Sequence, residues 1–441
     1  MKSKTLAVAF ALITMSLLPA VPGQQAGAPS ASSPLPELYP SFFAKLKKGD
    51  YLGLLLDMRR NEAGYRADER QRGGFLELMS VINSQVGNYA EAHAYLDEFM
   101  SAQQGRDKDV DRAPFDGYEP RDAVEAIRAA AGSHQVVMIN QEHDTPMHRA
   151  FTTRLLPVLY ARGFRYFAAE TLAEDAAELQ RRGYPTLKTG FYTADPVYAD
   201  LVRTAIRLGF KVVAYEYMPR DCQNPPDKPD FCQNERERGQ ASNLNERIFR
   251  ADPKAKVLIH VGYGHNSEAA RRGGGKLMAG YFKEFTGIDP LTVDQTVMSE
   301  HSAPDYEHPL YLYATSRGLV PRPVVFRNAR GELFAAQKGA RDITLFQPRS
   351  VYENGRPTWL GLDGARKPHR LPRDVCAQAA RCLVSARAAG ESADAAPVDR
   401  LEVSAAAAAP PPALLLPRGE FVVEAVDAEG KKVKEFRVKK R

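Results

Sequence analysis

Acidic and histidine side chains stand where four apolar segments of the sequence end. They are Glu142 and His143, Glu170, Glu216, and His265, which follow the segments 135–140, 164–169, 210–215 and 256–261. Carboxylates and imidazoles together can activate water, hold a metal ion or stabilise a charged intermediate. Because the carboxyl ends of parallel strands meet at one edge of a sheet, we expect these side chains to converge on one site.

The histidines that follow the first and last of these segments are candidates for a general base near neutral pH. The three glutamates can orient an imidazole, bind a metal ion or act as electrostatic partners. Neighbouring carboxylates raise each other's pKa unless a cation lies between them. We therefore expect a cation in the cluster, either a metal ion or an arginine such as Arg236 or Arg238.

Two further histidines lie near these residues in the sequence. His148 stands in the first turn of the helix predicted after Glu142, where it either supports the site from behind or lies on the surface. His260 lies inside an apolar segment. It is either a supporting residue of the site or a buried neutral histidine with a satisfied hydrogen bond.

Several familiar catalytic motifs are missing from the sequence. It has no GxxxxGK[ST], no GxGxxG after the first apolar segment and no GxSxG, and no cysteine follows an apolar segment of the predicted sheet. HExxH is also missing. These observations argue against a phosphate-binding loop and against a serine or cysteine nucleophile, so water is the expected nucleophile.

The apolar segments alternate with helical ones. Helices are predicted at 122–131, 146–161, 174–182, 196–208, 234–251 and 275–285. The helix at 146–161 has Asp144 and Thr145 as candidate N-caps, Pro146 in its first turn and Gly163 after its end. This alternation predicts an α/β fold with a parallel-sheet core and flanking helices.

Other regions surround this core, which we place at 121–375. Residues 36–103 are predicted to form a small helical N-terminal region, followed by a polar linker at 104–120. Short β segments at 291–293, 310–313, 323–326 and 343–346 either extend the sheet or cap it. The Ala/Pro-rich stretch 385–413 is predicted to be an unstructured linker, and 414–441 a terminal β-hairpin around Glu429-Gly430.

The N-terminus has the pattern of a secretory signal peptide over residues 1–28, with cleavage between 20 and 28. Its apolar core is too short to span a membrane, and no later segment is long and apolar enough. We therefore expect a periplasmic or secreted protein without a membrane span. The four cysteines fit an exported protein, because they can form the local disulfides Cys222–Cys232 and Cys376–Cys382. A four-cysteine zinc site is the alternative.

The composition fits a soluble globular protein, because 44% of the 441 residues are hydrophobic and 26% are charged. The net charge of +6 is spread along the chain. No block of basic residues is interleaved with aromatic ones, so nucleic acid is not an expected partner.

Four stretches carry a family resemblance: INQEHDTPMHR, FAAET, NERERGQASNLNERI and KVLIHVGYGHNSE. Together they resemble the erythromycin esterase/ChaN-like superfamily, with its TraB/Tiki relatives, over about residues 121–300. The resemblance implies a pocket at the strand ends made by Glu142, His143, Glu170, Arg236 and His265. Glutamate and histidine are adjacent here, as in the ChaN-like members.

We therefore predict an exported hydrolase of an ester, lactone or amide bond in a small molecule or peptide. His143 would activate water, with Glu142 or Glu170 orienting its imidazole, and Arg236 or His265 would stabilise the oxyanion. A second form of this hypothesis adds a divalent metal such as zinc or manganese. The alternatives are a ChaN-like protein that binds haem or iron without catalysis, and an interaction protein whose N-terminal helices bind a partner.

Overall fold

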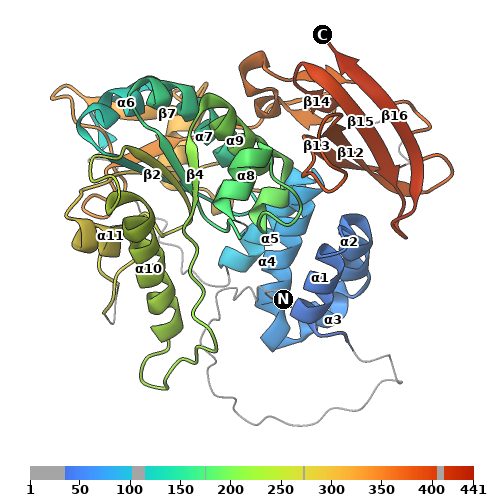
Figure 1. The fold of residues 1–441 in the computed structure, drawn as a ribbon, viewed down its shortest axis with the longest axis horizontal. Helices are drawn as coiled ribbons and strands as arrows, with labels where there is room; N and C mark the ends of the chain where they lie inside the picture. The colour runs from blue at the N-terminus through green and yellow to red at the C-terminus, as the bar shows by residue number, and fades with distance from the viewer. Residues whose placement is uncertain (1–34, 102–114, 174, 272–273, 405–411) are drawn as a thin grey trace.

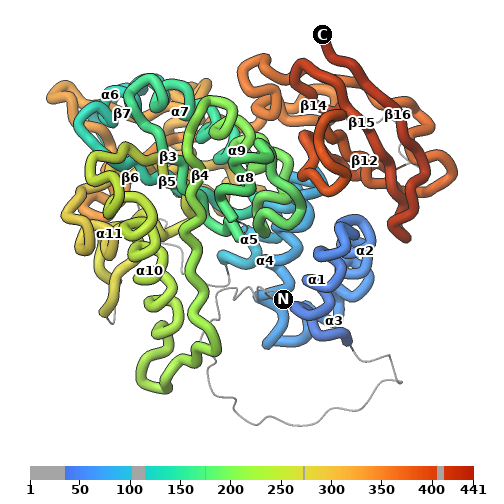
Figure 2. The backbone as a smooth tube through the Cα atoms, viewed as in Figure 1, coloured from blue at the N-terminus to red at the C-terminus, as the bar shows by residue number. Residues whose placement is uncertain are grey.

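The computed structural model describes residues 35–101, 115–173, 175–271, 274–404 and 412–441. The predicted signal peptide lies outside these residues. Figure 1 shows N-terminal helices, an α/β part built on a central sheet, and a group of C-terminal strands beside them. The same path is followed by the backbone tube of Figure 2.

The α/β part is built on an eight-stranded sheet with the order β1-β7-β8-β6-β2-β5-β3-β4. Its strands are β1 Tyr118–Asp122, β2 Val136–Gln141, β3 Tyr166–Ala169, β4 Lys211–Ala214, β5 Val257–Gly262, β6 Leu291–Met298, β7 Val324–Asn328 and β8 Ile343–Phe346. The pairs β2–β5, β5–β3 and β3–β4 are all parallel. The predicted α/β fold is confirmed. The four strands that precede the candidate site residues, β2, β5, β3 and β4, are neighbours in the sheet.

The edge of the sheet beyond β6 differs from the rest. β7 pairs antiparallel with both β1 and β8, and β1 lies partly in the segment predicted as a linker. Three of the four β segments predicted beyond residue 290 extend the sheet as β6, β7 and β8. The fourth prediction, at 310–313, is wrong: these residues belong to helix α12 (Pro309–Ser316), which His308 caps by accepting from the amide of Leu310.

Helices cover both faces of the sheet. They are α6 Ala123–Ala130, α7 Pro146–Ala161, α8 Ala176–Arg182, α9 Pro196–Leu208, α10 Phe231–Leu244 and α11 Met278–Thr286. Val137 and Ile139 of β2 share one core with α7 and α9, whereas Val136 and Met138 share another with α10 and α11. Because both faces are buried, β2 is apolar at successive positions instead of alternating.

The N-terminal helices bury their apolar residues against the α/β part. These helices are α1 Leu38–Leu46, α2 Tyr51–Arg60, α3 Glu62–Ala67, α4 Glu69–Gln85 and α5 Tyr89–Ser101. α4 is buried from Phe75 to Gln85, and its Leu76 belongs to the same core as Tyr198 of α9. Packing therefore places residues from the first hundred positions close to the sheet.

The C-terminal strands form a separate antiparallel sheet with the order β13-β12-β15-β16. These strands are β12 Arg381–Ala388, β13 Asp399–Ser404, β15 Gly419–Val426 and β16 Lys432–Lys440. The linker predicted at 385–413 is thus wrong at 385–388 and 399–404, which belong to β12 and β13, because Ala386, Leu401 and Val403 pack into a β core; residues 405–411 lie outside the described chain. β15 and β16 form the hairpin predicted around Glu429-Gly430. Shorter pairs are β9 Tyr352–Glu353 with β10 Arg356–Pro357, and β11 Lys367–His369 with β14 Leu414–Leu416.

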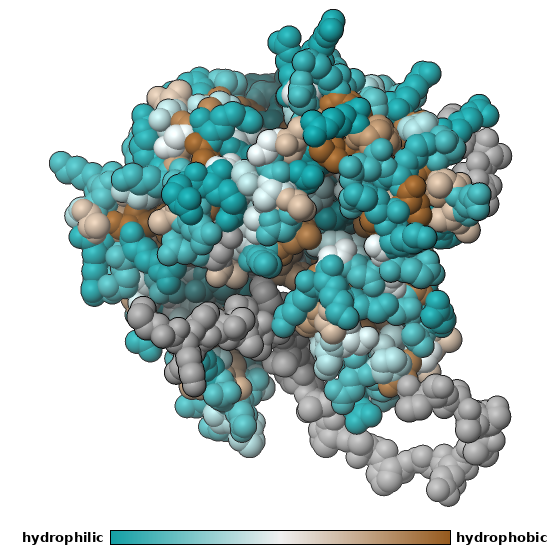
Figure 3. All heavy atoms as spheres, turned by 45° about the vertical axis from the view of Figure 1, so that its right-hand side comes forward, coloured by the Kyte–Doolittle hydropathy of each residue, from teal (hydrophilic) through white to brown (hydrophobic). Residues whose placement is uncertain are grey.

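Both predicted disulfides are confirmed. Cys222 is bonded to Cys232 and Cys376 to Cys382, which leaves no thiol for a four-cysteine zinc site. The face drawn in Figure 3 is mostly hydrophilic, with hydrophobic residues in small separate groups. Among the described residues, no helix combines the length and apolar character needed to cross a membrane.

Candidate active site

A pocket of about 330 Å³ lies at the carboxyl ends of β2, β3 and β5. His143, Glu170, Arg236 and His265, four of the residues predicted from the sequence, line it together. The pairing of residues between β2, β5 and β3 explains why these side chains come together. Gln141 of β2 is opposite Gly262 of β5, and Ala169 of β3 is opposite His260, so the residues that follow these strands emerge side by side.

His143 is buried with one ring nitrogen engaged and one bare. Its Nδ1 lies 2.6 Å from the hydroxyl of Tyr192, whose ring stacks on the imidazole at 4.2 Å. Its Nε2 has no hydrogen-bond partner. Burial lowers the pKa of His143 to about 3, so the imidazole is neutral near pH 7. When Nδ1 carries the proton and donates it to Tyr192, Nε2 offers a lone pair to the pocket.

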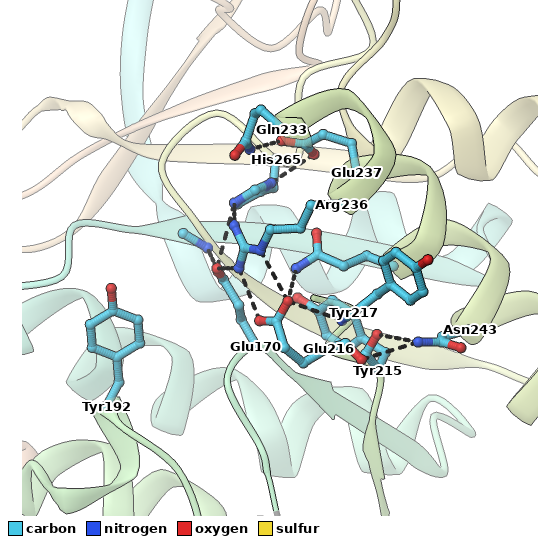
Figure 4. Close-up of polar contacts among 12 residues, drawn as sticks. Glu170, Tyr192, Tyr215, Glu216, Tyr217, Gln233, Arg236, Glu237, Asn243 and His265 are labelled. Carbon is cyan, nitrogen blue, oxygen red and sulfur yellow. Dashed lines mark hydrogen bonds and ion pairs between the residues drawn. The ribbon is translucent and has the colours of Figure 1, made fainter. Parts of the chain in front are cut away.

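Arg236 of α10 is the cation expected among the carboxylates. Its Nη2 donates to Glu170 at 2.8 Å and to Glu216 at 2.9 Å, and its Nε donates to Glu216 at 3.1 Å. Figure 4 shows this guanidinium between the two carboxylates. Glu216 therefore acts through Arg236 and is not among the lining residues of the pocket.

His265 lies between two carboxylates as well. Its Nδ1 is 2.7 Å from Glu237 and its Nε2 is 3.5 Å from Glu170. Burial opposes the charged imidazolium, but Glu237 and Glu170 outweigh burial and raise the pKa of His265 to about 10. Burial would likewise raise the pKa of Glu170, but His265 and Arg236 hold it well below its usual value. The network therefore presents an imidazolium and a guanidinium to the pocket at neutral pH.

The backbone is unusual where the chain leaves β3 and β5. Thr171 and Tyr263 both line the pocket and have positive φ angles of 66° and 35°, a region that residues other than glycine seldom adopt. Such strain clusters at functional sites. Between them, Gly262 lies so close to the site that a Cβ would be 2.8 Å from a carboxylate oxygen of Glu170, and closer still to Nε2 of His143.

Glu142 does not line the pocket. It is buried on the other side of the turn, where it accepts from the hydroxyl of Thr145 at 2.9 Å. The group that contacts the imidazole of His143 is therefore Tyr192, and neither of the glutamates predicted for that role makes the contact. Thr145 is the N-cap of α7 but its side chain forms no capping bond, and the buried carboxylate of Asp144, the other N-cap candidate, has no hydrogen-bond partner.

His148 and His260 are both buried and neither lines the pocket. His148 accepts from the amide of Glu142 at 3.1 Å and reaches Ser299 at 3.1 Å, so it supports the turn from behind and the surface alternative is wrong. His260 contacts Thr152 of α7 at 3.3 Å through Nδ1 and lies edge-on to Tyr198. Burial lowers its pKa to about 3.

Other residues of the pocket were missed by sequence reasoning. Tyr192, Glu237, Glu77, Phe43 and Phe191 all line it. Glu237 could have been predicted from the sequence, because it is adjacent to Arg236 on a helix that was expected to contribute to the site. Glu77 could also have been predicted, because it is an acidic residue within an apolar helical stripe. Tyr192 and the phenylalanines come from elements that no strand-end pattern identifies.

The donor set does not suit a metal ion. No group of three or more His, Cys, Asp or Glu side chains in the described part of the chain is arranged to hold one. Arg236 occupies the position between the carboxylates that a metal would need, and both nitrogens of His265 lie beside carboxylates, those of Glu237 and Glu170. The metal form of the hydrolase hypothesis does not fit these residues.

Comparisons with known proteins give likenesses of fold only. No family model matches the sequence, and no curated protein matches it significantly. The type III effector HopBA1 is 15% identical with a TM-score of 0.34, over 52% of this chain and 96% of that chain. ChaN of Campylobacter jejuni, a structure with cofacial heme binding, is 10% identical with a TM-score of 0.32, over 51% and 92%.

A third similar structure is the C-terminal region of Pasteurella multocida toxin, described as having a thiol-protease-like catalytic triad. It is 10% identical with a TM-score of 0.30, and the match covers 64% of this chain but 34% of the toxin chain. Likenesses this distant carry no information on function.

Proposed function

We propose that the protein is a hydrolase of ester, lactone or amide bonds that uses water as its nucleophile. One observation carries the proposal: His143, whose Nε2 has no hydrogen-bond partner, shares a pocket with the pair Arg236 and His265, each held by a carboxylate. The first group can accept a proton from water, and the second can stabilise the negative charge that develops on a carbonyl oxygen.

In this proposal His143 takes the proton of the attacking water at Nε2. Tyr192 holds the tautomer that this requires, because its oxygen accepts from Nδ1–H. An imidazole with a pKa of about 3 is a weak base in the free protein. The carboxylate of Glu170, which raises that pKa, would stabilise the imidazolium as it forms. Glu170 thus acts on the charge of His143 without touching its Nδ1.

Arg236 and His265 would bind the oxyanion. Two carboxylates hold Arg236 in place, and Glu237 holds His265. Such fixed donors need no reorganisation when charge develops, and this is the main source of their effect on rate. After the carbonyl carbon is attacked, the proton held on His143 returns to the leaving oxygen or nitrogen, and the two products leave.

A panel of p-nitrophenyl esters, aryl lactones and p-nitroanilides tests the activity. We expect the protein to hydrolyse one of these classes without a burst of the released phenol or aniline, because no acyl-enzyme forms. Failure to hydrolyse any member would reject the proposal. A burst equal to the enzyme concentration would reject water as the first nucleophile.

A second candidate function rests on the bare Nε2 of His143. An imidazole nitrogen without a hydrogen-bond partner, in a pocket lined partly by Phe43, Phe191 and Leu277, could bind haem iron, with His143 as the residue that would hold it. A Soret band that shifts on mixing haem with the protein, and does not shift with His143→Ala, would support this function.

The location of the protein is also a proposal. The two disulfides fit an oxidising compartment, either the periplasm or the exterior of the cell. Substrates that reach such a protein are small molecules or peptides from outside the cytoplasm.

A further inference from the structure

Glu77 is a buried acid of the pocket that the hydrolytic scheme does not use. It projects from α4, the long helix of the N-terminal region, and its exposure is 8%. It lines the same pocket as His143 and His265. In the described part of the chain its carboxyl forms no hydrogen bond or ion pair. An unpaired acid is costly to bury, so its position calls for a partner that binds there.

Aromatic rings surround this end of the pocket. Phe43, Phe191, Tyr192 and Tyr263 line it together with Glu77. Phe43 packs edge-on to Phe191 at 6.0 Å, and Phe191 packs edge-on to Tyr192 at 4.9 Å. The faces of aromatic rings attract cations. A carboxyl among aromatic rings is therefore a receptor for an ammonium group.

The charges of the rest of the pocket favour the same ligand. Three carboxylates, those of Glu170 and Glu237 in the pocket and that of Glu216, which binds Arg236 from outside the lining, face two cations, Arg236 and His265. Arg271 also lines the pocket, and Asp230 balances its charge at 3.1 Å. The local surplus is negative, so a positively charged group is attracted and an anionic substrate is repelled.

We propose that Glu77 and the aromatic rings beside it bind an ammonium group, so that the ligands of this pocket are amines. If the protein is the proposed hydrolase, its substrates are esters, lactones or amides that carry a protonated amine near the bond to be cleaved. The N-terminal helices would then define which substrates bind, while the strand ends perform the chemistry.

Burial raises the pKa of Glu77 to about 7, and this gives amine binding a pH signature. The ammonium group pairs with the ionised carboxylate. Affinity should therefore fall as the pH is lowered below 7. The titratable groups that Glu77 influences are Tyr39, Tyr192 and Tyr263, and their pKa values are all raised, so none of them changes charge in this range.

Calorimetric binding of benzylamine and of benzyl alcohol tests the amine site without requiring catalysis. We expect benzylamine to bind the native protein at least about tenfold more tightly than the alcohol does. Glu77→Gln should remove this preference. Glu69→Gln, an exposed change of the same charge on the same helix, should keep it. Equal binding of the two probes by the native protein, or unchanged preference in Glu77→Gln, would overturn the proposal.

If Glu77→Gln does not fold, the pH dependence of benzylamine binding to the native protein tests the proposal instead. Benzylamine affinity that is the same at pH 6 and pH 8 would overturn the proposal, and a clear fall at pH 6 would support it. The substrate class is tested with p-nitrophenyl esters of an ω-amino acid and of an alkanoic acid of equal length. A lower KM for the amino ester, lost in Glu77→Gln, is the expected result, and equal KM values would reject that class.

These measurements separate the two proposals. Benzylamine binding without any hydrolysis would leave the amine site standing and reject the hydrolase. Hydrolysis without a preference for amines would do the reverse.

Discussion

At the scale of single residues, Gly262 governs how closely the parts of the site approach each other. It is the last residue of β5, and its amide donates to a carboxylate oxygen of Glu170. The imidazole of His143 lies on the same side, so any side chain here would displace one of these groups.

Gly262→Ala should therefore lower kcat/KM by about a hundredfold or more, since displacement of a catalytic group by an ångström has that effect. Gly73→Ala, in α4, is the control, because its added methyl would meet Phe99 at an ordinary 3.8 Å and Gly73 does not line the pocket. Steady-state kinetics with a thermal melt of each variant makes the comparison. Similar activity of the two variants would contradict the geometry described.

His265 links the charge network to stability. Its folded pKa of about 10 exceeds the value of 6.5 for an ordinary histidine, so the folded protein binds an extra proton between these pH values. The stabilisation is complete below pH 6.5 and is lost as the pH rises through 10. Its size is on the order of a few kcal/mol.

The free energy of urea unfolding should therefore fall between pH 7 and pH 10, and Glu237→Gln should flatten this decline. Glu69→Gln, an exposed acid on α4, serves as the control for the loss of one charge. A decline of the same steepness in Glu237→Gln would show that the pair His265–Glu237 does not hold the proton.

Much of the site at this scale was predictable, because acids and histidines after buried strands have few structural reasons to be there. Glu142 was placed wrongly because adjacent residues in a turn point in different directions, and its sequence position does not say which one faces the pocket. Tyr192 was out of reach for another reason. Its contact with His143 is made by tertiary packing across 49 positions.

At the scale of elements, α10 delivers Arg236 and Glu237 to the pocket. The disulfide Cys222–Cys232 ends in the first turn of this helix, and Met218 and Gln233 on either side of it line the pocket. The disulfide therefore fixes the start of the helix relative to β4. The helix ends in a π-helical turn, Asn245–Phe249.

Replacing Cys222 and Cys232 by serine should lower both thermal stability and kcat/KM. The second disulfide, Cys376–Cys382, lies in the C-terminal β part, and its removal should lower stability alone. Each loss of stability should be about 2–4 kcal/mol or less, because these loops are short. Equal loss of activity in the two double variants would contradict a positioning role for the first disulfide.

Elements with strong end signals were predicted well. α9 begins at Asp195-Pro196 and ends before Gly209, whose φ is 94°, as the sequence indicated. The helix α12 was mistaken for a strand because Leu310–Tyr313 is short and apolar. In so short a segment the helical repeat of about 3.6 residues cannot be told from the two-residue repeat of a strand. β12 and β13 were missed because the stretch around them is rich in alanine and proline, and each strand has a single β-branched residue, Val384 and Val403.

At the scale of the whole molecule, the C-terminal strands are tied to the rest by buried ion pairs. Arg356 donates to Asp399 of β13 at 2.6 Å, and both are almost fully buried. Arg203 of α9 donates to Glu391 between β12 and β13 at 2.6 Å. The C-terminal sheet is thus part of one packed structure, although none of its strands contributes a residue to the lining of the pocket.

Asp399→Ala should destabilise the protein by about 3–5 kcal/mol, because it leaves Arg356 buried without a partner. Glu420→Ala, which breaks the exposed pair with Lys439, should have no measurable effect. Urea unfolding followed by circular dichroism measures both. A small effect of Asp399→Ala would show that the Arg356–Asp399 pair does not hold the C-terminal sheet.

The most direct test of the site is the activity of His143→Ala on the ester, lactone or amide class that the native protein hydrolyses. We predict that kcat/KM falls at least about a hundredfold, the usual effect of removing a general base, with little change in the melting temperature. His369→Ala, in β11, should behave like the native protein. Full activity of His143→Ala would contradict the assignment of this pocket as the site of hydrolysis.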